Sequence, residues 1–372
     1  MGALAAAAVA LALVLATSAE LTNADSRGAA ARDHIARGLR ASPGRSPRPL
    51  LRARVGKSPD STLPFAPNRA DRRTRPYEVP SLYADGLACS VGCRPYGAEP
   101  GWPLAPFHSQ HPIRAGLNEL RPESLHVGID IQAADGARVY AVQPGSAQVL
   151  AASGPNARVQ VGNYIYWHIV PFVTPGQEVK PFVTVLGTVM PGYGHIAFSE
   201  LGAAGEYVNP LRPEGGVLKP YVDRAAPVIG RPRVAATGEV SVAAYDPQSF
   251  VRRTTYITPI LAPAAIAYRL YDRAGSALTP LLWAFRGTHL LPFSERSLIY
   301  AHGSREPGYS CFATRQVCIP HWRYRVAGGL APPLPIGLPP GRYRLTIYAW
   351  DWADNRTALD TRVTMSGLGW RG

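Results

Sequence analysis

The chain has 372 residues, 46% of them hydrophobic and only 17% charged, so it is long enough for two domains and apolar enough to build their cores. Its 37 prolines and 36 glycines favour short strands and many turns over long helices. The formal net charge is +14, but residues 25–75 hold thirteen Arg and Lys against four Asp and so supply +9 of it. A charge confined to one low-complexity stretch argues against specific nucleic-acid binding and suits an anionic surface instead.

The N-terminal residues predict export. Residues 3–19 form an apolar run that ends in small residues, which is typical of a secretory signal peptide cleaved near Ala19, although a retained membrane anchor (1–19) is the alternative. Segment 20–80 is rich in Arg, Pro, Ser and Ala without periodicity, so we expect a disordered basic linker that is loosely attracted to anionic cell-wall polymers or a membrane surface. The expected location is therefore extracellular, in the cell envelope or periplasmic.

The four cysteines fit an exported protein. Cys89 and Cys93 would close one small loop, and Cys311 and Cys318 would close another. Two local disulfides are the simplest prediction. A metal site built from the four is disfavoured, because neither spacing is C-x-x-C and no histidine lies at zinc-finger spacing.

Between residues 81 and 221, short apolar runs alternate with Gly and Pro turns, and no long helical periodicity interrupts them. A second set of alternating runs fills residues 225–368 and ends in GRYRLTIYAWDWADN. The pattern predicts an all-β, antiparallel protein with two β domains, 81–221 and 225–368. Asp351, Asp354 and Asn355 could be calcium ligands, but a turn after the last long strand explains them better.

The most informative stretch is Leu125–Ile131, LHVGIDI. His126 and Asp130 lie four residues apart around Gly128, and an imidazole and a carboxylate held this close can bind one divalent cation. Downstream lie His168 in YWHI and Gly194-His195-Ile196-Ala197-Phe198.

These landmarks, together with DGARVYAVQPGSAQVL, the hairpin from Pro175 to Gly187 and Val208-Asn209-Pro210, resemble the lysostaphin-type (LytM-type) zinc metallopeptidases over about residues 103–213. The resemblance implies a zinc enzyme that cuts peptide cross-links in peptidoglycan. Residues 225–368 resemble an immunoglobulin-like or fibronectin-like sandwich, from strand count and spacing alone.

Carried over residue by residue, the resemblance makes His126 and Asp130 zinc ligands and gives His168 and His195 the roles beside the attacking water and the oxyanion. Asn118 matches a groove-lining position before the H-x-G-x-D strand. Where the family has the second histidine of H-x-H, this chain has Ala197, which leaves two protein ligands instead of three and weakens zinc binding.

Three hypotheses follow from Ala197. One is an enzyme with weakened or altered cross-link hydrolysis, in which His195, on the same strand face as Ala197, serves as substitute ligand while Glu200 faces away. Another is a non-catalytic wall-binding or hydrolase-regulating protein that keeps the groove. The last, a β-rich adhesin with incidental histidines, does not explain the ordered landmarks. Whether the protein is an enzyme stays open on the sequence alone.

Overall fold

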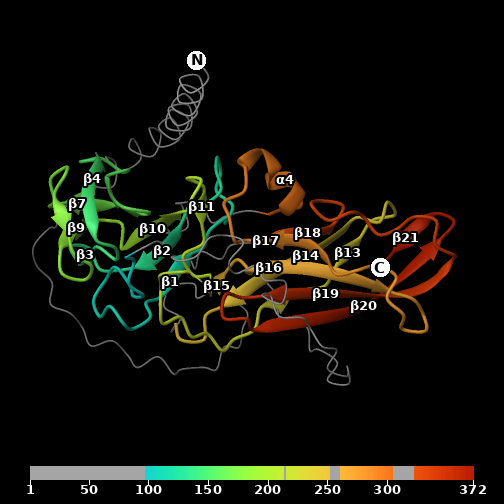
Figure 1. Cartoon of the computed structure of the whole chain (residues 1–372). Helices are drawn as coiled ribbons and strands as arrows, with labels where there is room; N and C mark the ends of the chain where they lie inside the picture. The colour runs from blue at the N-terminus through green and yellow to red at the C-terminus, as the bar shows by residue number, and fades with distance from the viewer. Residues whose placement is uncertain (1–96, 213–214, 252–259, 305–321) are drawn as a thin grey trace, which may run out of the picture. The chain divides into compact units, whose positions relative to one another are not determined.

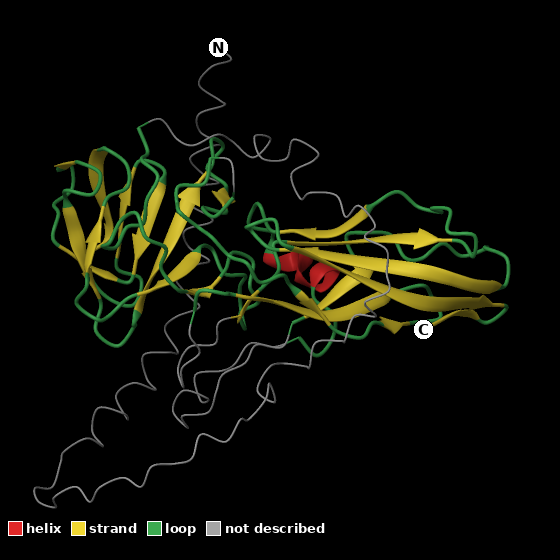
Figure 2. Cartoon of the chain, turned by 90° about the horizontal axis from the view of Figure 1, so that it is seen from below, coloured by secondary structure: helices red, strands yellow, loops and turns green. Residues whose placement is uncertain are grey.

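The computed structural model of the protein describes residues 97–212, 215–251, 260–304 and 322–372, all of which belong to one compact unit, Asp60–Gly372. In these ranges the strands pair antiparallel throughout, and the α-helical structure is one turn, α4 (Arg296–Ile299), which follows the 3-10 turn η1 (Phe293–Glu295) (Figures 1 and 2). The predicted all-β, antiparallel class is confirmed.

The first sheet has eight strands and contains the H-x-G-x-D motif and the GHIAF segment. Its path runs β1-β2-β10-β6-β5-β4-β8, and β11 pairs with β10. In that order the strands are β1 (Ile113–Ala115), β2 (Ile129–Gln132), β10 (His195–Leu201), β6 (Tyr164–Trp167), β5 (Arg158–Val161), β4 (Gly145–Ala151), β8 (Glu178–Val179) and β11 (Tyr207–Val208). A three-stranded sheet accompanies it, with the order β3 (Arg138–Tyr140), β9 (Val185–Val189) and β7 (Ile169–Pro171).

The C-terminal residues form two five-stranded sheets. In one sheet, β14 (Val240–Pro247) pairs with all four other strands. These are β12 (Val228–Ile229), β13 (Arg233–Val234), β15 (Ile260–Leu261) and β18 (Arg323–Ala327). The other has the order β17 (Leu282–Arg286), β16 (Ala265–Tyr271), β19 (Gly341–Trp350), β20 (Arg356–Ser366) and β21 (Gly369–Arg371).

One apolar core lies between these two C-terminal sheets. It contains Val242 of β14 and Tyr324 of β18 from one C-terminal sheet, and Tyr268 of β16 and Ile347 of β19 from the other, all with no exposed surface. In β16 and at the end of β19 both faces are apolar and buried, because Ala267 and Trp350 pack into a second core on the other side of the sheet. The likeness of this pair of sheets to an immunoglobulin-like sandwich stays a prediction, as does the domain boundary between 221 and 225.

Several predictions concern residues outside the described ranges. The N-terminal segments 1–19 and 20–80 and all four cysteines, Cys89, Cys93, Cys311 and Cys318, are among them. The signal peptide, the basic linker and the two disulfides therefore stay predictions. No helix in the described part of the chain combines the length and apolarity that crossing a membrane requires.

Candidate metal site

The eight-stranded sheet packs one face on an apolar core, which contains Val159, Tyr166 and Leu186. Strand alternation places the conspicuous polar residues on the opposite face of this sheet. In β2, Ile129 and Ile131 are fully buried in that core, so Asp130 between them points to the opposite face. In β10, Ile196 and Phe198 take the core side and leave His195 and Ala197 on the same face as Asp130.

The pairing register brings the sequence motifs together on this face. β10 lies between β2 and β6, with Ala197 opposite Asp130 on one side and opposite Trp167 on the other. His168 follows directly after Trp167 at the end of β6. The site is therefore assembled by the neighbouring strands β2, β10 and β6.

Gly128 is needed where the motif passes β10. A Cβ at this position would lie 2.5 Å from the Phe198 carbonyl oxygen and 2.7 Å from Ser199 Oγ. Real side chains do not approach this closely, so a larger residue would push His126 and Asp130 away from β10.

Four side chains converge on this face. His126 Nε2 lies 2.9 Å from Asp130 Oδ1, and His195 Nε2 lies 3.7 Å from Asp130 Oδ2. The ring of His168 lies edge-on to that of His195, with centroids 5.2 Å apart. The Asp130 carboxylate is thus between the two imidazole Nε2 atoms, and His168 is next to the second of them.

Each of the three histidines has its Nδ1 atom against a backbone carbonyl. The distances are 2.9 Å from His126 to the Gly116 oxygen, 2.8 Å from His168 to the Pro155 oxygen and 2.7 Å from His195 to the Tyr193 oxygen. A carbonyl can only accept, so Nδ1 carries the proton in His126 and His168. In these two rings, when neutral, the Nε2 lone pairs are then free, which is the arrangement found in metal-binding histidines. His195 Nδ1 also lies 3.0 Å from the Arg114 guanidinium, which can only donate.

Arg114 supports the arrangement at His195. Its Nη1 donates to the Tyr193 carbonyl at 2.9 Å and lies 3.0 Å from His195 Nδ1. Since a guanidinium can only donate, His195 Nδ1 accepts from Arg114 in one tautomer and donates to the Tyr193 oxygen in the other. Arg114 could not be selected from the sequence, because a single arginine between Ile113 and Ala115 has no distinguishing pattern.

His168 adopts a left-handed backbone conformation, with φ of 61°, that β-strand residues other than glycine rarely take. Its backbone N–H donates to the Ala157 carbonyl and its carbonyl accepts from Met190 N–H, both at 2.9 Å. Its ring stacks on Tyr193 with centroids 4.5 Å apart. A conformation of this kind is held by its surroundings, and such positions cluster at functional sites.

The electrostatics of the site favour an ionised Asp130 carboxylate beside neutral His168 and His195 rings. Although burial opposes it, attraction from His126, His195 and Arg121 holds the pKa of Asp130 well below its usual range. Burial, assisted by the neighbouring His195, lowers the pKa of His168 to about 4. Burial also lowers the pKa of His195, so both rings are neutral at pH 7 and present lone pairs.

The donor set fits a zinc ion. His126 Nε2 and Asp130 Oδ1 lie 2.9 Å apart, and both side chains are largely buried. An imidazole and a carboxylate this close pair with each other in the absence of metal and are also close enough to bind one cation together. Two imidazole nitrogens and a carboxylate oxygen are ligands that zinc accepts, and three protein ligands leave a position open. His126, Asp130 and His195 would hold the ion.

Ala197 occupies the position where the family resemblance expects a ligand. Its side chain is 5% exposed and packs with Ile165 and Trp167 in a small apolar cluster on the face of the site. Glu200 lies on the core side, as expected, and forms a buried ion pair at 2.5 Å with Arg212. The closest candidate for a third ligand is therefore His195.

Asn118 is fully buried and is not turned toward the histidines. Its Nδ2 donates to the His289 carbonyl at 2.6 Å and its Oδ1 accepts from Leu291 N–H at 2.8 Å. Its backbone N–H donates to the His126 carbonyl at 2.9 Å. These contacts give Asn118 a structural role, and the groove-lining role stays a prediction without support from its neighbours.

Two further residues at the site were not expected from the sequence. Arg121 Nη2 lies 3.7 Å from Asp130 Oδ2, and Asp135 accepts from Gly192 N–H at 2.6 Å and from Gly194 N–H at 2.9 Å. Asp135 thereby fixes the turn that carries Tyr193 and leads into His195. An Asp before Gly is an ordinary turn residue, so its partner in a distant turn could not be inferred.

Comparison with solved structures finds a distant structural likeness. The antimicrobial peptidase lysostaphin from Staphylococcus simulans matches with 15% identity and a TM-score of 0.24, over 68% of this chain and 98% of that chain. No protein-family model matches the chain, and no curated protein matches it. At this level of similarity the assignment of the site rests on its own geometry.

Proposed function

We propose that the protein is an exported, peptidoglycan-directed zinc metallopeptidase whose zinc is held by His126, Asp130 and His195. The observation that carries the proposal is the shared orientation of the histidines, each of which has its Nδ1 atom against a backbone carbonyl. That pattern directs Nε2 of His126 and His195 toward the two oxygens of Asp130. The peptidoglycan assignment comes from the resemblance of residues 103–213 to the lysostaphin-type family.

The proposed chemistry is hydrolysis of a peptide cross-link. When bound, zinc would polarise the scissile carbonyl and lower the pKa of a bound water so that it supplies hydroxide near neutral pH. His168 is not needed as a ligand, and its neutral Nε2 is available to accept the proton of the attacking water. Arg121, beside Asp130, is placed to attract a carboxylate or the developing oxyanion of the substrate.

The reassignment of His195 has a cost for catalysis. In the lysostaphin-type family the histidine at this position stands beside the attacking water. As a zinc ligand, His195 can no longer accept the proton of that water. His168 alone would then serve as general base. We therefore expect activity below that of an enzyme with a complete H-x-H motif, by roughly the 10²–10⁴-fold that one proton-transfer group contributes.

The test is peptide release from purified peptidoglycan by the full chain with one equivalent of zinc. Asp130→Asn should lower the rate at least about 100-fold, since it removes the charge that holds the cation. Asp272→Asn, on a turn in the C-terminal part, is the matched control and should leave the rate unchanged. Zinc-loaded, folded protein that releases no peptide at any concentration would contradict the proposal.

A non-catalytic wall-binding or regulatory protein is the second candidate, and the burial of Ala197 among Ile165 and Trp167 favours it. If no third ligand is present, Ala197→His should complete the site and raise zinc affinity at least about tenfold. If His195 is already the third ligand, Ala197→His should crowd the apolar cluster of Ile165 and Trp167. Zinc affinity should then be equal to that of the wild type or lower.

A further inference from the structure

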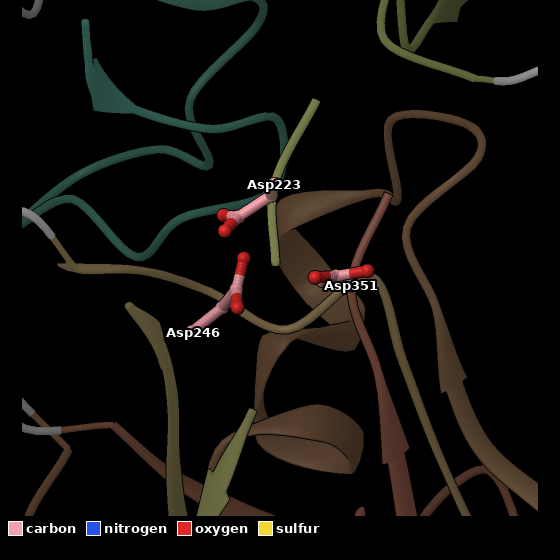
Figure 3. A group of neighbouring side chains, drawn as sticks. All are labelled: Asp223, Asp246 and Asp351. Carbon is pink, nitrogen blue, oxygen red and sulfur yellow. The ribbon is translucent and has the colours of Figure 1, made fainter. Parts of the chain in front are cut away.

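Three aspartates from distant parts of the sequence meet inside the C-terminal part of the protein. Asp223 lies in the segment between β11 and β12, Asp246 in β14 and Asp351 directly after β19. Each is buried, and one carboxylate oxygen from each lies within 4.8 Å of the others. Figure 3 shows the carboxylates of Asp223 and Asp246 directed toward each other, with that of Asp351 beside them.

Two of the carboxylates are oriented by hydrogen bonds. Asp223 Oδ1 accepts backbone N–H groups of Arg224, Ala225 and Ser249, at 2.6, 3.0 and 3.0 Å. Its Oδ2 is buried without a partner.

Asp351 is held from within its own turn. Its Oδ1 accepts from Ala353 N–H at 2.9 Å and from Asn355 N–H at 2.7 Å, and its Oδ2 accepts from Asn355 Nδ2 at 2.6 Å. The turn that the sequence predicted here is therefore present, but it joins β19 to the long strand β20 instead of following the last long strand. It also brings Asp351 to the other two aspartates, which the turn interpretation did not anticipate.

Asp246 differs from the other two. Its side chain has no exposed surface, and neither of its carboxylate oxygens has a hydrogen-bond partner. Among the described residues no lysine or arginine forms an ion pair with any of the three aspartates. Burial and the charges of Asp351 and Asp223 raise the pKa of Asp246 well above its usual range. A buried carboxylate without a partner is strongly unfavourable unless something neutralises it.

We propose that Asp223, Asp246 and Asp351 bind a calcium ion. The donors are all hard carboxylate oxygens, with neither nitrogen nor sulfur, which suits calcium and not zinc. Oxygens that bind one Ca²⁺ at about 2.3–2.6 Å lie no more than about 5 Å apart, as these do. The unpartnered oxygens of Asp223 and Asp246 are the ones left to face the ion.

The ion would join three segments. It links the segment 222–225, the end of β14 and the turn after β19. The first and last of these are already connected, because Asn355 Nδ2 donates to the Asp223 carbonyl at 3.0 Å. The site shares no residue with His126, Asp130 or His195, so its role is structural and its test is independent of the zinc proposal.

The experiment is thermal unfolding of the full chain, stripped with EDTA and then titrated with Ca²⁺. At about 100 times its dissociation constant, Ca²⁺ should raise the melting temperature by about 5 °C or more. Asp246→Asn should abolish this shift. Asp354→Asn, in the same turn but outside the cluster, is the matched control and should keep the full shift.

Terbium gives a direct readout of occupancy. Tb³⁺ at the site should be sensitised by Trp352, next to Asp351, and displaced by Ca²⁺ in the wild type and in Asp354→Asn. His126→Ala should retain both the emission and the calcium shift, which separates this site from the zinc site. An equal melting temperature in EDTA and in Ca²⁺, with no terbium emission from the wild type, would overturn the proposal and leave the aspartates protonated instead.

Discussion

At the scale of single residues, the site depends on which ring nitrogen each histidine keeps free. Carbonyl contacts at Nδ1 make that choice in His126 and His168, whereas in His195 the Tyr193 carbonyl and the Arg114 guanidinium both contact Nδ1. The sequence allowed the four residues to be selected, because H-x-G-x-D and the later histidines occur in a recognisable order. It did not reveal the carbonyl partners, since any residue can present a carbonyl.

Gly128→Ala tests the closest approach in the motif. The added methyl would meet the Phe198 carbonyl and Ser199 Oγ, so β2 and β10 must separate, and we expect a loss of about 1–3 kcal/mol in unfolding free energy. Chemical denaturation measures the loss. Gly367→Ala, where a Cβ meets nothing within 4 Å, is the control. Equal stability of the two variants would show that the approach is not tight.

At the scale of elements, the turn before β10 sets the position of His195. Asp135, from the segment between β2 and β3, accepts two N–H groups of this turn and is exposed to solvent. Those hydrogen bonds lower its pKa below the ordinary value of 3.8. The contribution of the Asp135 carboxylate to folding stability is therefore complete above pH 3.8 and is lost as the pH falls through the lowered pKa.

We predict that Asp135→Ala weakens zinc binding about tenfold at neutral pH, because the Tyr193 carbonyl no longer holds His195 in place. Calorimetric titration with zinc measures this. Asp272→Ala removes a similar carboxylate that accepts Ser276 N–H at 2.7 Å in another sheet, and it should bind zinc like the wild type. Unchanged affinity in Asp135→Ala would mean that the turn keeps its shape without the carboxylate.

At the scale of the whole described unit, hydrogen bonds between side chains and backbone connect the first sheet to the C-terminal sheets. Gln248 Oε1 accepts from Ile113 N–H at 3.0 Å and its Nε2 donates to the Ile113 carbonyl at 2.7 Å, both buried. β1 is thereby paired on one side by β2 and on the other by a glutamine amide. Alternation of apolar residues predicted the strands, but contacts of this kind depend on tertiary placement.

Gln248→Ala should cost about 2–4 kcal/mol of unfolding free energy, because two buried backbone groups lose their partner. Gln110 makes the same pair of bonds to Val222, at 2.7 and 3.2 Å, but in an exposed position. Gln110→Ala should therefore cost less than about 1 kcal/mol, as water replaces the amide. Similar losses in both variants would contradict the role assigned to burial.

The aspartate cluster shows where prediction from sequence ended. Asp223, Asp246 and Asp351 have no common spacing, and each alone is an ordinary residue at a strand end or turn. Only the packing of the C-terminal sheets brings them together. The zinc site was predictable to the extent that it was local, with His126 and Asp130 in one motif and His195 on the adjacent strand.

The central claim, that His126, Asp130 and His195 hold one zinc ion, is tested most directly by zinc titration of the metal-free full chain with its single-residue variants. The wild type should bind one equivalent, and His195→Ala should weaken binding at least about tenfold, while His168→Ala should leave affinity near that of the wild type. Binding that is unchanged in His195→Ala, or absent from the folded wild type, would contradict the claim.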